Sequence, residues 1–159
     1  MTRPRARGPR GKRVVCKTPA GHWKVLSTIA AMTVRGMIAC GTFEGATDTD
    51  AFATFLRDGL LPRLKPGQVV VMDNLSVHKS PTAEELIKAA GVRVLYLPAY
   101  SPDYNPIEMA ISKVKSVLKT LSERTVDTLF AAIGTALQSI TPQDAIHFIR
   151  HSGYVAMIE

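Results

Sequence analysis

The sequences VVVMDN at residues 69–74 and LPAYSPDYNPIE at residues 97–108 decide how this chain folds. The first is an apolar run ending on a carboxylate, as in a buried strand of an open α/β sheet, where ligands gather at the carboxyl ends of strands. The second is a proline-rich loop leading into a helix, with Asn105 as the expected N-cap and Pro106 as the first helical residue. The two segments deliver Asp73 and Glu108, and two carboxylates placed in this way can hold a divalent metal ion against a phosphate.

Each of the two acids also has a purely structural interpretation. An Asp after a strand often caps the following turn, and the neighbouring Asn74 favours that interpretation. A Glu at the third helical position, such as Glu108, commonly reaches back to the N-cap backbone. A capping Glu does not need an approach loop fixed by prolines, however, so the pair taken together favours a metal site. A P-loop nucleotidase is excluded, because the chain has no Gly-x-x-x-x-Gly-Lys-Ser/Thr sequence.

The segments around this stretch predict an α/β fold with a mixed sheet. Two short β-type runs, 25–33 and 37–43, flank the turn sequence Arg35-Gly36 and predict a hairpin. Caps, prolines and apolar periodicity predict the helices. They are expected from Thr47–Asp50 to Pro66-Gly67, from Ser80-Pro81 to Gly91, from Asn105 onward, over 126–139, and from Thr141-Pro142 to Gly153. The resulting order β-β-α-β-α-β-α-α-α joins a hairpin to parallel crossovers.

The net charge of +7 lies in one segment. Residues 1–17 carry seven basic residues and no acid, so the other 13 basic and 13 acidic residues cancel. We expect residues 1–22, which are rich in Arg, Gly and Pro, to form a basic arm and residues 23–159 to form one domain. A solvated tail and a nucleic-acid-binding arm are equally compatible with this charge. The candidate nucleic-acid-binding residues of the arm are Arg3, Arg5, Arg7, Arg10, Lys12 and Arg13.

Other candidate contacts to nucleic acid lie in the domain. His78 and Lys79 follow Asp73 closely and could contact phosphates, although a lone His is more often a loop hydrogen-bonder and a lone Lys is usually solvated. Lys113 and Lys115 fall on the outer surface of the helix that begins at Asn105. Trp23, Tyr100 and Tyr104 could stack on bases, with packing the commoner role for a Trp. His147 and His151 are one helical turn apart but have no third ligand nearby, so a zinc site is not expected.

The location of the protein follows from its cysteines and its hydrophobic segments. Cys16 and Cys40 are too few for a disulfide framework and suggest buried, inert thiols in a reducing compartment. No apolar segment follows the basic N-terminus as in a signal peptide, and none is long enough to span a membrane. We therefore expect a cytoplasmic protein without membrane contact or a small-molecule substrate.

Residues 70–79 and 95–108 resemble the Asp-Asp-Glu transposases, and within them the bacterial insertion-sequence enzymes related to mariner elements. In that family 34 residues separate the second Asp from the Glu, and residues 74–107 between Asp73 and Glu108 give the same number. The resemblance implies a ribonuclease-H-like mixed sheet flanked by helices. It also implies two Mg²⁺ or Mn²⁺ ions held by three acids, and cleavage and strand transfer of DNA by in-line displacement at phosphorus. On this resemblance Asp73 is the second acid and Glu108 the third. The implied partners are transposon-end and target DNA, and a homodimer on the DNA is compatible with the resemblance.

The chain departs from the family at the first acid. No Asp or Glu precedes Glu44, whereas the family's first Asp lies on the first, central strand of the sheet. We therefore expect a C-terminal portion of such a transposase that lacks the central strand, binds metal weakly and is inactive alone. The alternatives are a non-catalytic DNA-binding or dimerisation fragment, and a remnant without a role.

Overall fold

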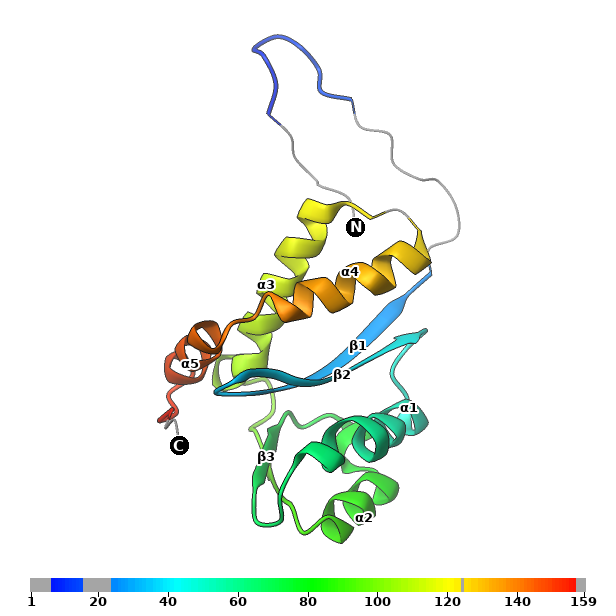
Figure 1. The fold of residues 1–159 in the computed structure, drawn as a ribbon, viewed down its shortest axis with the longest axis vertical. Helices are drawn as coiled ribbons and strands as arrows, with labels where there is room; N and C mark the ends of the chain where they lie inside the picture. The colour runs from blue at the N-terminus through cyan, green and yellow to red at the C-terminus, as the bar shows by residue number, and fades with distance from the viewer. Residues whose placement is uncertain (1–6, 16–23, 124, 157–159) are drawn as a thin grey trace.

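The computed structural model describes residues 7–15, 24–123 and 125–156 of the chain, and its elements follow the predicted order (Figure 1). Strands alternate with helices in the first part, and three helices complete the second. The strands and α-helices are β1 (Leu26–Thr33), β2 (Gly36–Glu44), α1 (Thr49–Thr54), β3 (Val69–Met72), α2 (Pro81–Ala89), β4 (Arg93–Tyr96), α3 (Pro106–Leu121), α4 (Val126–Gln138) and α5 (Pro142–His151). Shorter π- or 3₁₀-helical segments are η1 (Phe55–Leu60), η2 (Leu61–Arg63), η3 (Ser76–Lys79) and η4 (Pro102–Tyr104).

The strands form two separate two-stranded sheets. β1 and β2 pair antiparallel as the predicted hairpin, with Gly36 at φ 106° after the turn and a register shift between Ala31 and Met32. β3 and β4 pair in parallel, with Val69 opposite Arg93 and Met72 opposite Tyr96. Within the described residues no strand joins β1 to β3.

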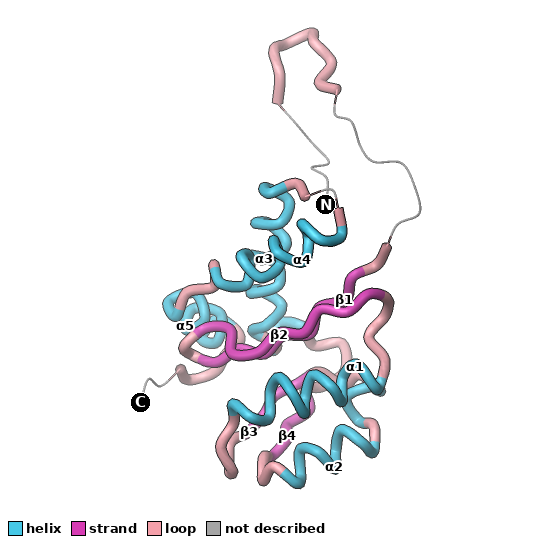
Figure 2. The backbone as a smooth tube through the Cα atoms, turned by 45° about the vertical axis from the view of Figure 1, so that its right-hand side comes forward, coloured by secondary structure: helices cyan, strands magenta, loops and turns pink. Residues whose placement is uncertain are grey.

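A groove of about 430 Å³ runs between the unpaired edges of β1 and β3. Its lining is mainly apolar and includes Ile29 to Thr33 on one side and Val69 to Met72 on the other. Figure 2 shows the hairpin and the β3–β4 pair as distinct layers, with α1 and α2 beside the pair. The groove leads to Asp73 and Glu108, which also line it.

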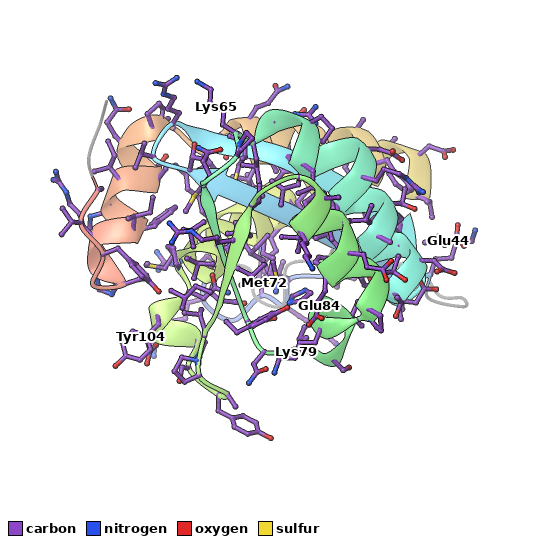
Figure 3. All side chains as sticks on the ribbon, turned by 90° about the horizontal axis from the view of Figure 1, so that it is seen from below. Glu44, Lys65, Met72, Lys79, Glu84 and Tyr104 are labelled. Atoms are coloured by element: carbon purple, nitrogen blue, oxygen red, sulfur yellow. The ribbon has the colours of Figure 1, made fainter. Side chains whose placement is uncertain are left out.

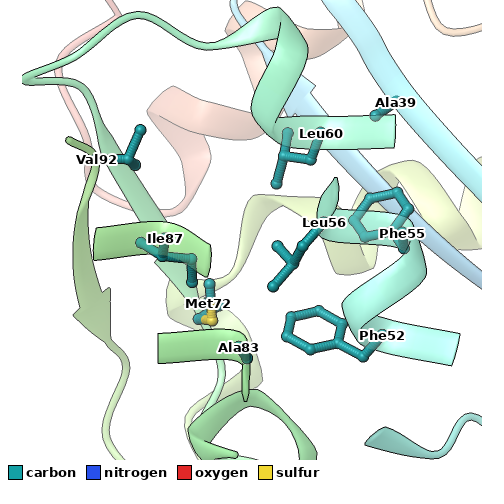
Figure 4. Packing of buried hydrophobic residues seen from close by; sticks show 9 residues of the cluster. All are labelled: Ala39, Phe52, Phe55, Leu56, Leu60, Met72, Ala83, Ile87 and Val92. Atoms are coloured by element: carbon teal, nitrogen blue, oxygen red, sulfur yellow. The ribbon is translucent and has the colours of Figure 1, made fainter. Parts of the chain in front are cut away.

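The two faces of the hairpin contact two hydrophobic clusters, because successive strand side chains point to opposite faces. Ile29, Ala31 and Ile38 pack with the first cluster, which α1, η1, β3 and α2 supply (Figure 4). Ala30, Met32 and Met37 pack with the second cluster, which lies in α3 and α4. The fold therefore places η1 against one face of the hairpin and α3 and α4 against the other. Asp73 follows β3 and Glu108 lies in α3.

Helix starts agree with the sequence, and two details do not. Ser80, Asn105 and Thr141 are N-caps followed by Pro, as predicted. The helix expected as far as Pro66-Gly67 is α-helical only to Thr54 and continues as η1 and η2 to Arg63. Pro62, which has no N–H to donate within a helix, lies in η2 near this end. Cys40 was expected to be buried but is exposed on β2, since alternation in the strand buries its neighbour Ala39 instead. Cys16 lies outside the described residues.

None of the helices in the described ranges is both long and apolar enough to cross a membrane.

Candidate functional site

Asp73 lies directly after β3 and is held by a short turn. The apolar residues of β3 carry the chain out of the sheet, and η3 then turns it back so that His78 faces Asp73. His78 Nδ1 lies 2.7 Å from Asp73 Oδ1 and 3.3 Å from the Asp73 carbonyl oxygen. The Leu75 N–H also donates to Asp73 Oδ1, at 3.4 Å. The His78 and Leu75 contacts with the Asp73 carboxylate both use Oδ1, so Oδ2 remains available for a ligand.

The neighbours of η3 fix the orientation of this turn. The His78 ring packs on Phe52, with the ring centroids 4.5 Å apart, and only 17% of its side chain is exposed. The Tyr96 hydroxyl donates to the His78 carbonyl oxygen at 3.1 Å, and burial raises the pKa of Tyr96, which keeps it a donor. Lys79 Nζ lies 5.2 Å from the centroid of the Tyr96 ring. The turn therefore presents Asp73 through contacts from α1, β4 and η3.

Glu108 lies in the first turn of α3, as the Asn105-Pro106 sequence predicts. Asn105 caps this helix by accepting from the Ile107 N–H at 3.4 Å. In α5 the cap and Asp144 form a reciprocal capping box, but no such box joins Glu108 to Asn105 in the described part of α3. Glu108 is exposed, so the capping interpretation does not account for this carboxylate.

Asp73 and Glu108 line the same two hollows. One is the groove between β1 and β3, and the other, of about 370 Å³, lies between residues 73–75 and the loop 97–102. The geometry brings one partly exposed and one exposed carboxylate to a common cavity, which fits a hard divalent cation with oxygen ligands. Within the described residues no group of three or more His, Cys, Asp and Glu side chains is arranged for a metal ion. The described residues thus bring two carboxylates from separate elements to one cavity.

The predicted basic residues fall into three groups. Arg7, Arg10, Lys12 and Arg13 are exposed, and Arg3 and Arg5 lie outside the described residues. Lys79 and Lys115 are also exposed, and Figure 3 shows the Lys79 side chain at the periphery of the molecule. His78 and Lys113 already have carboxylate partners, since Lys113 Nζ lies 2.6 Å from Asp144 Oδ2.

Two contacts that shape the site have partners that the sequence does not predict. The sequence favours His78 as a loop hydrogen-bonder or a phosphate contact, and a single 3₁₀ turn brings it back to Asp73, five positions earlier. The Tyr154 hydroxyl donates to the Tyr104 carbonyl oxygen at 2.8 Å, beside the start of α3. No local signal in the sequence predicts this second contact, because its partners lie 50 positions apart.

Comparison with known proteins gives a family match and a fold match. The family described as DDE superfamily endonuclease matches residues 1–129. No curated protein sequence is significantly similar to the chain.

Among solved structures, the catalytic domain of Mos1 transposase, determined with raltegravir and Mg, is similar with a TM-score of 0.65 and 18% identity, covering 80% of this chain and 69% of that one. The Mos1 mariner paired-end complex with Mn has a TM-score of 0.64 and 14% identity, and the match covers 96% of this chain and 47% of that one. The Mos1 strand transfer complex has a TM-score of 0.54 and 16% identity, and the match covers 99% of this chain and 52% of that one. The chain therefore spans about half the length of the Mos1 chains in these two complexes. At these identities the likeness establishes the fold, a ribonuclease-H-like arrangement of mixed strands flanked by helices.

Proposed function

Because the chain belongs to the DDE superfamily endonuclease family, we propose that it is the catalytic-domain portion of a transposase that acts on DNA phosphodiesters. Asp73 and Glu108 are its metal ligands and catalytic acids in this proposal. Residues 1–22 act as a DNA-binding arm, and residues 23–159 form the domain that holds the site. The partners are transposon-end and target DNA, with a homodimer as the form that binds them.

One observation carries the proposal. Asp73 and Glu108 lie 35 positions apart in the sequence, yet both line one hollow. Among the described residues, neither Asp73 Oδ2 nor the Glu108 carboxylate has a polar partner. A divalent cation bound in this hollow would attract both carboxylates and occupy oxygen ligands that have no protein partner. The proposed function therefore gives a role to their shared position.

The residues of the site have separate roles in the proposed reaction. Mg²⁺ or Mn²⁺ held by Asp73 and Glu108 would supply charge neutralisation at the attacking and leaving oxygens of a phosphodiester. His78 acts as a positioning residue, because its contact with Asp73 Oδ1 fixes the carboxylate and leaves Oδ2 for the cation. The prolines of the loop 97–108 fix the direction from which Glu108 enters.

We further propose that a chain of these 159 residues has weak or no nuclease activity by itself. The family site uses three acids, and this sequence has no Asp or Glu before Glu44. Two carboxylates provide fewer oxygen ligands and less negative charge for two divalent ions than three do. The groove between β1 and β3 leads to both acids, and a further strand there would reach the same cavity.

DNA binding in the proposal rests on the exposed basic residues. The arm residues Arg3, Arg5, Arg7, Arg10, Lys12 and Arg13, together with Lys79 and Lys115, contribute most of the phosphate contacts. His78 and Lys113 contribute less, because each already faces a carboxylate.

Fluorescence anisotropy with duplex DNA and a plasmid-nicking assay test the two parts of this proposal. We expect salt-sensitive binding that does not depend on the DNA sequence. A chain without residues 1–17 should show a much flatter dependence of affinity on salt concentration. In Mg²⁺ or Mn²⁺, nicking by the wild type is expected to equal that of the Asp73→Asn, Glu108→Gln double variant. Absence of DNA binding would refute the function, and metal-dependent nicking above the variant's level would refute the inactivity.

A non-catalytic DNA-binding or dimerisation fragment is the second candidate function. The lack of a three-acid group among the described residues favours it. The two candidates differ in their metal requirement, since a fragment that only binds DNA has no use for Asp73 and Glu108. Ca²⁺ supports metal-dependent DNA binding without cleavage. Equal DNA affinity with and without Ca²⁺ would therefore favour the second candidate.

A further inference from the structure

Tyr100 has an unusual backbone conformation and an unusual degree of exposure. Its side chain is fully exposed, at 103% of the reference area. Its φ is +57°, and Ser122 is the only other described non-glycine residue with a positive φ. Ser122 ends α3 in the left-handed conformation that helix C-termini commonly adopt. No helix end explains Tyr100, so both the strain and the exposure of this large ring need another reason.

The loop around Tyr100 is anchored on both sides. Leu97 is buried, and its N–H donates to the Met72 carbonyl oxygen at 2.8 Å. Pro98 and Pro102 restrict the backbone on either side of Tyr100, and the Ser101 hydroxyl donates to the Ala99 carbonyl oxygen at 3.3 Å. The strained conformation is thus imposed by the surroundings of the loop, and it directs the ring away from the protein.

Tyr100 also lines the 370 Å³ hollow that contains Asp73 and Glu108. This volume lies within the range of sites that bind small molecules. The remaining lining includes the polar residues Asn74 and Ser101. Polar groups and two carboxylates that attract a cation therefore share one hollow, and the exposed Tyr100 ring stands beside it. A nucleotide can use all three, through its phosphate, its polar edges and its base.

We propose that this hollow binds one nucleotide of the DNA strand beside the reacting phosphate, with the Tyr100 ring stacked on its base. The inference rests on the proposed function, since that function places the phosphate at Asp73 and Glu108. Stacking needs only the π-face of a base, so this subsite accepts all four bases. The base must be unpaired or at a strand end to reach the ring, because paired bases are stacked within the duplex.

Binding of DNA with a single-stranded overhang tests the proposal. The overhang carries 2-aminopurine, placed at each position in turn, and binding is followed by anisotropy and by 2-aminopurine fluorescence in Ca²⁺. The variants are Tyr100→Ala, Tyr100→Phe, which keeps the ring, and Tyr104→Ala as the control. Tyr104 is a nearby exposed tyrosine (Figure 3) that does not line the hollow.

We expect wild type and Tyr100→Phe to quench the probe at one overhang position. Tyr100→Ala should lose that quenching and bind about 5- to 150-fold more weakly, and Tyr104→Ala should behave like wild type. Unchanged affinity and quenching in Tyr100→Ala would overturn this inference and leave the proposed function standing. A change in oligomeric state of Tyr100→Ala without a change in DNA binding would assign the ring to a protein interface and also overturn it. Failure of the wild type to bind DNA would refute the proposed function itself.

Discussion

At the scale of single residues, the site depends on which polar atoms are already engaged. Asp73 uses Oδ1 for His78 and the Leu75 N–H, while Lys113 is engaged by Asp144 and Lys115 is exposed. The two lysines lie two positions apart on α3 and have the same charge, but their surroundings differ. They therefore form a matched pair for measuring what a free and a paired cation contribute to DNA binding.

Lys115→Ala should weaken DNA binding more than Lys113→Ala. Each lost phosphate contact lowers the slope of log affinity against log salt by roughly 0.9. We expect the steepness of this slope to fall by roughly 0.9, the value of one contact, for Lys115→Ala. For Lys113→Ala we expect a smaller fall. Anisotropy titrations at four or five salt concentrations measure both slopes. A larger decrease for Lys113→Ala would show that Asp144 does not hold this side chain in the complex.

The sequence alone could predict the backbone positions of the functional residues but not their contacts. Asp73 at a strand end and Glu108 after a cap and a proline follow from local rules. The contact between His78 and Asp73 and the pairing of Lys113 with Asp144 depend on how elements pack. The same holds for Cys40, whose exposure is decided by the face of β2 that the helices cover.

At the scale of elements, α3 and α5 are joined by the Lys113–Asp144 pair. Asp144 also closes the capping box of α5 with Thr141. The hydrogen bonds from Lys113 and then from Thr141 lower the pKa of Asp144 from 3.8 to about 2. A carboxyl whose pKa is lowered by folding stabilises the fold at any pH above its unfolded value, and this contribution disappears as the pH falls through the folded value.

Lys113→Met tests the pair while leaving the Asp144 cap in place. We expect the variant to be less stable than wild type at neutral pH by at most about 1 kcal/mol, because both partners are partly exposed. The difference should begin to shrink as the pH falls from about 4 to about 2, since the paired Asp144 carboxylate becomes increasingly protonated over this range. Thermal melts at intervals of half a pH unit measure it, with Lys115→Met as control. A difference that stays constant down to pH 2 would contradict the assignment.

At the scale of the whole molecule, the groove between β1 and β3 separates the two sheets. The edges of β1 and β3 that face it have no strand partner among the described residues. Val69, Val71 and Leu95 are exposed although they are apolar, which is unusual for strands of a parallel pair. The two parts of the fold are therefore held together mainly by the clusters on either face of the hairpin.

Hydrogen exchange should reveal these free edges. The alternate amides of β1 that point away from β2, and those of β3 that point away from β4, should exchange much faster than the amides within each pair. NMR-detected exchange on the isolated chain resolves the two sets. Equal protection on both edges of β1 would indicate that another segment of the protein occupies the groove.

Divalent metal binding is the measurement that tests the central claim most directly. Mn²⁺ titrations followed by electron paramagnetic resonance should show weak binding by the wild type and a large loss of binding in both Asp73→Asn and Glu108→Gln. Asp103→Asn is the control, because Asp103 is an exposed acid near Glu108 that does not line the hollow shared by Asp73 and Glu108. Loss of binding confined to the first two variants is the predicted result. Mn²⁺ binding that persists in Asp73→Asn, or that falls equally in Asp103→Asn, would contradict a cation site built from Asp73 and Glu108.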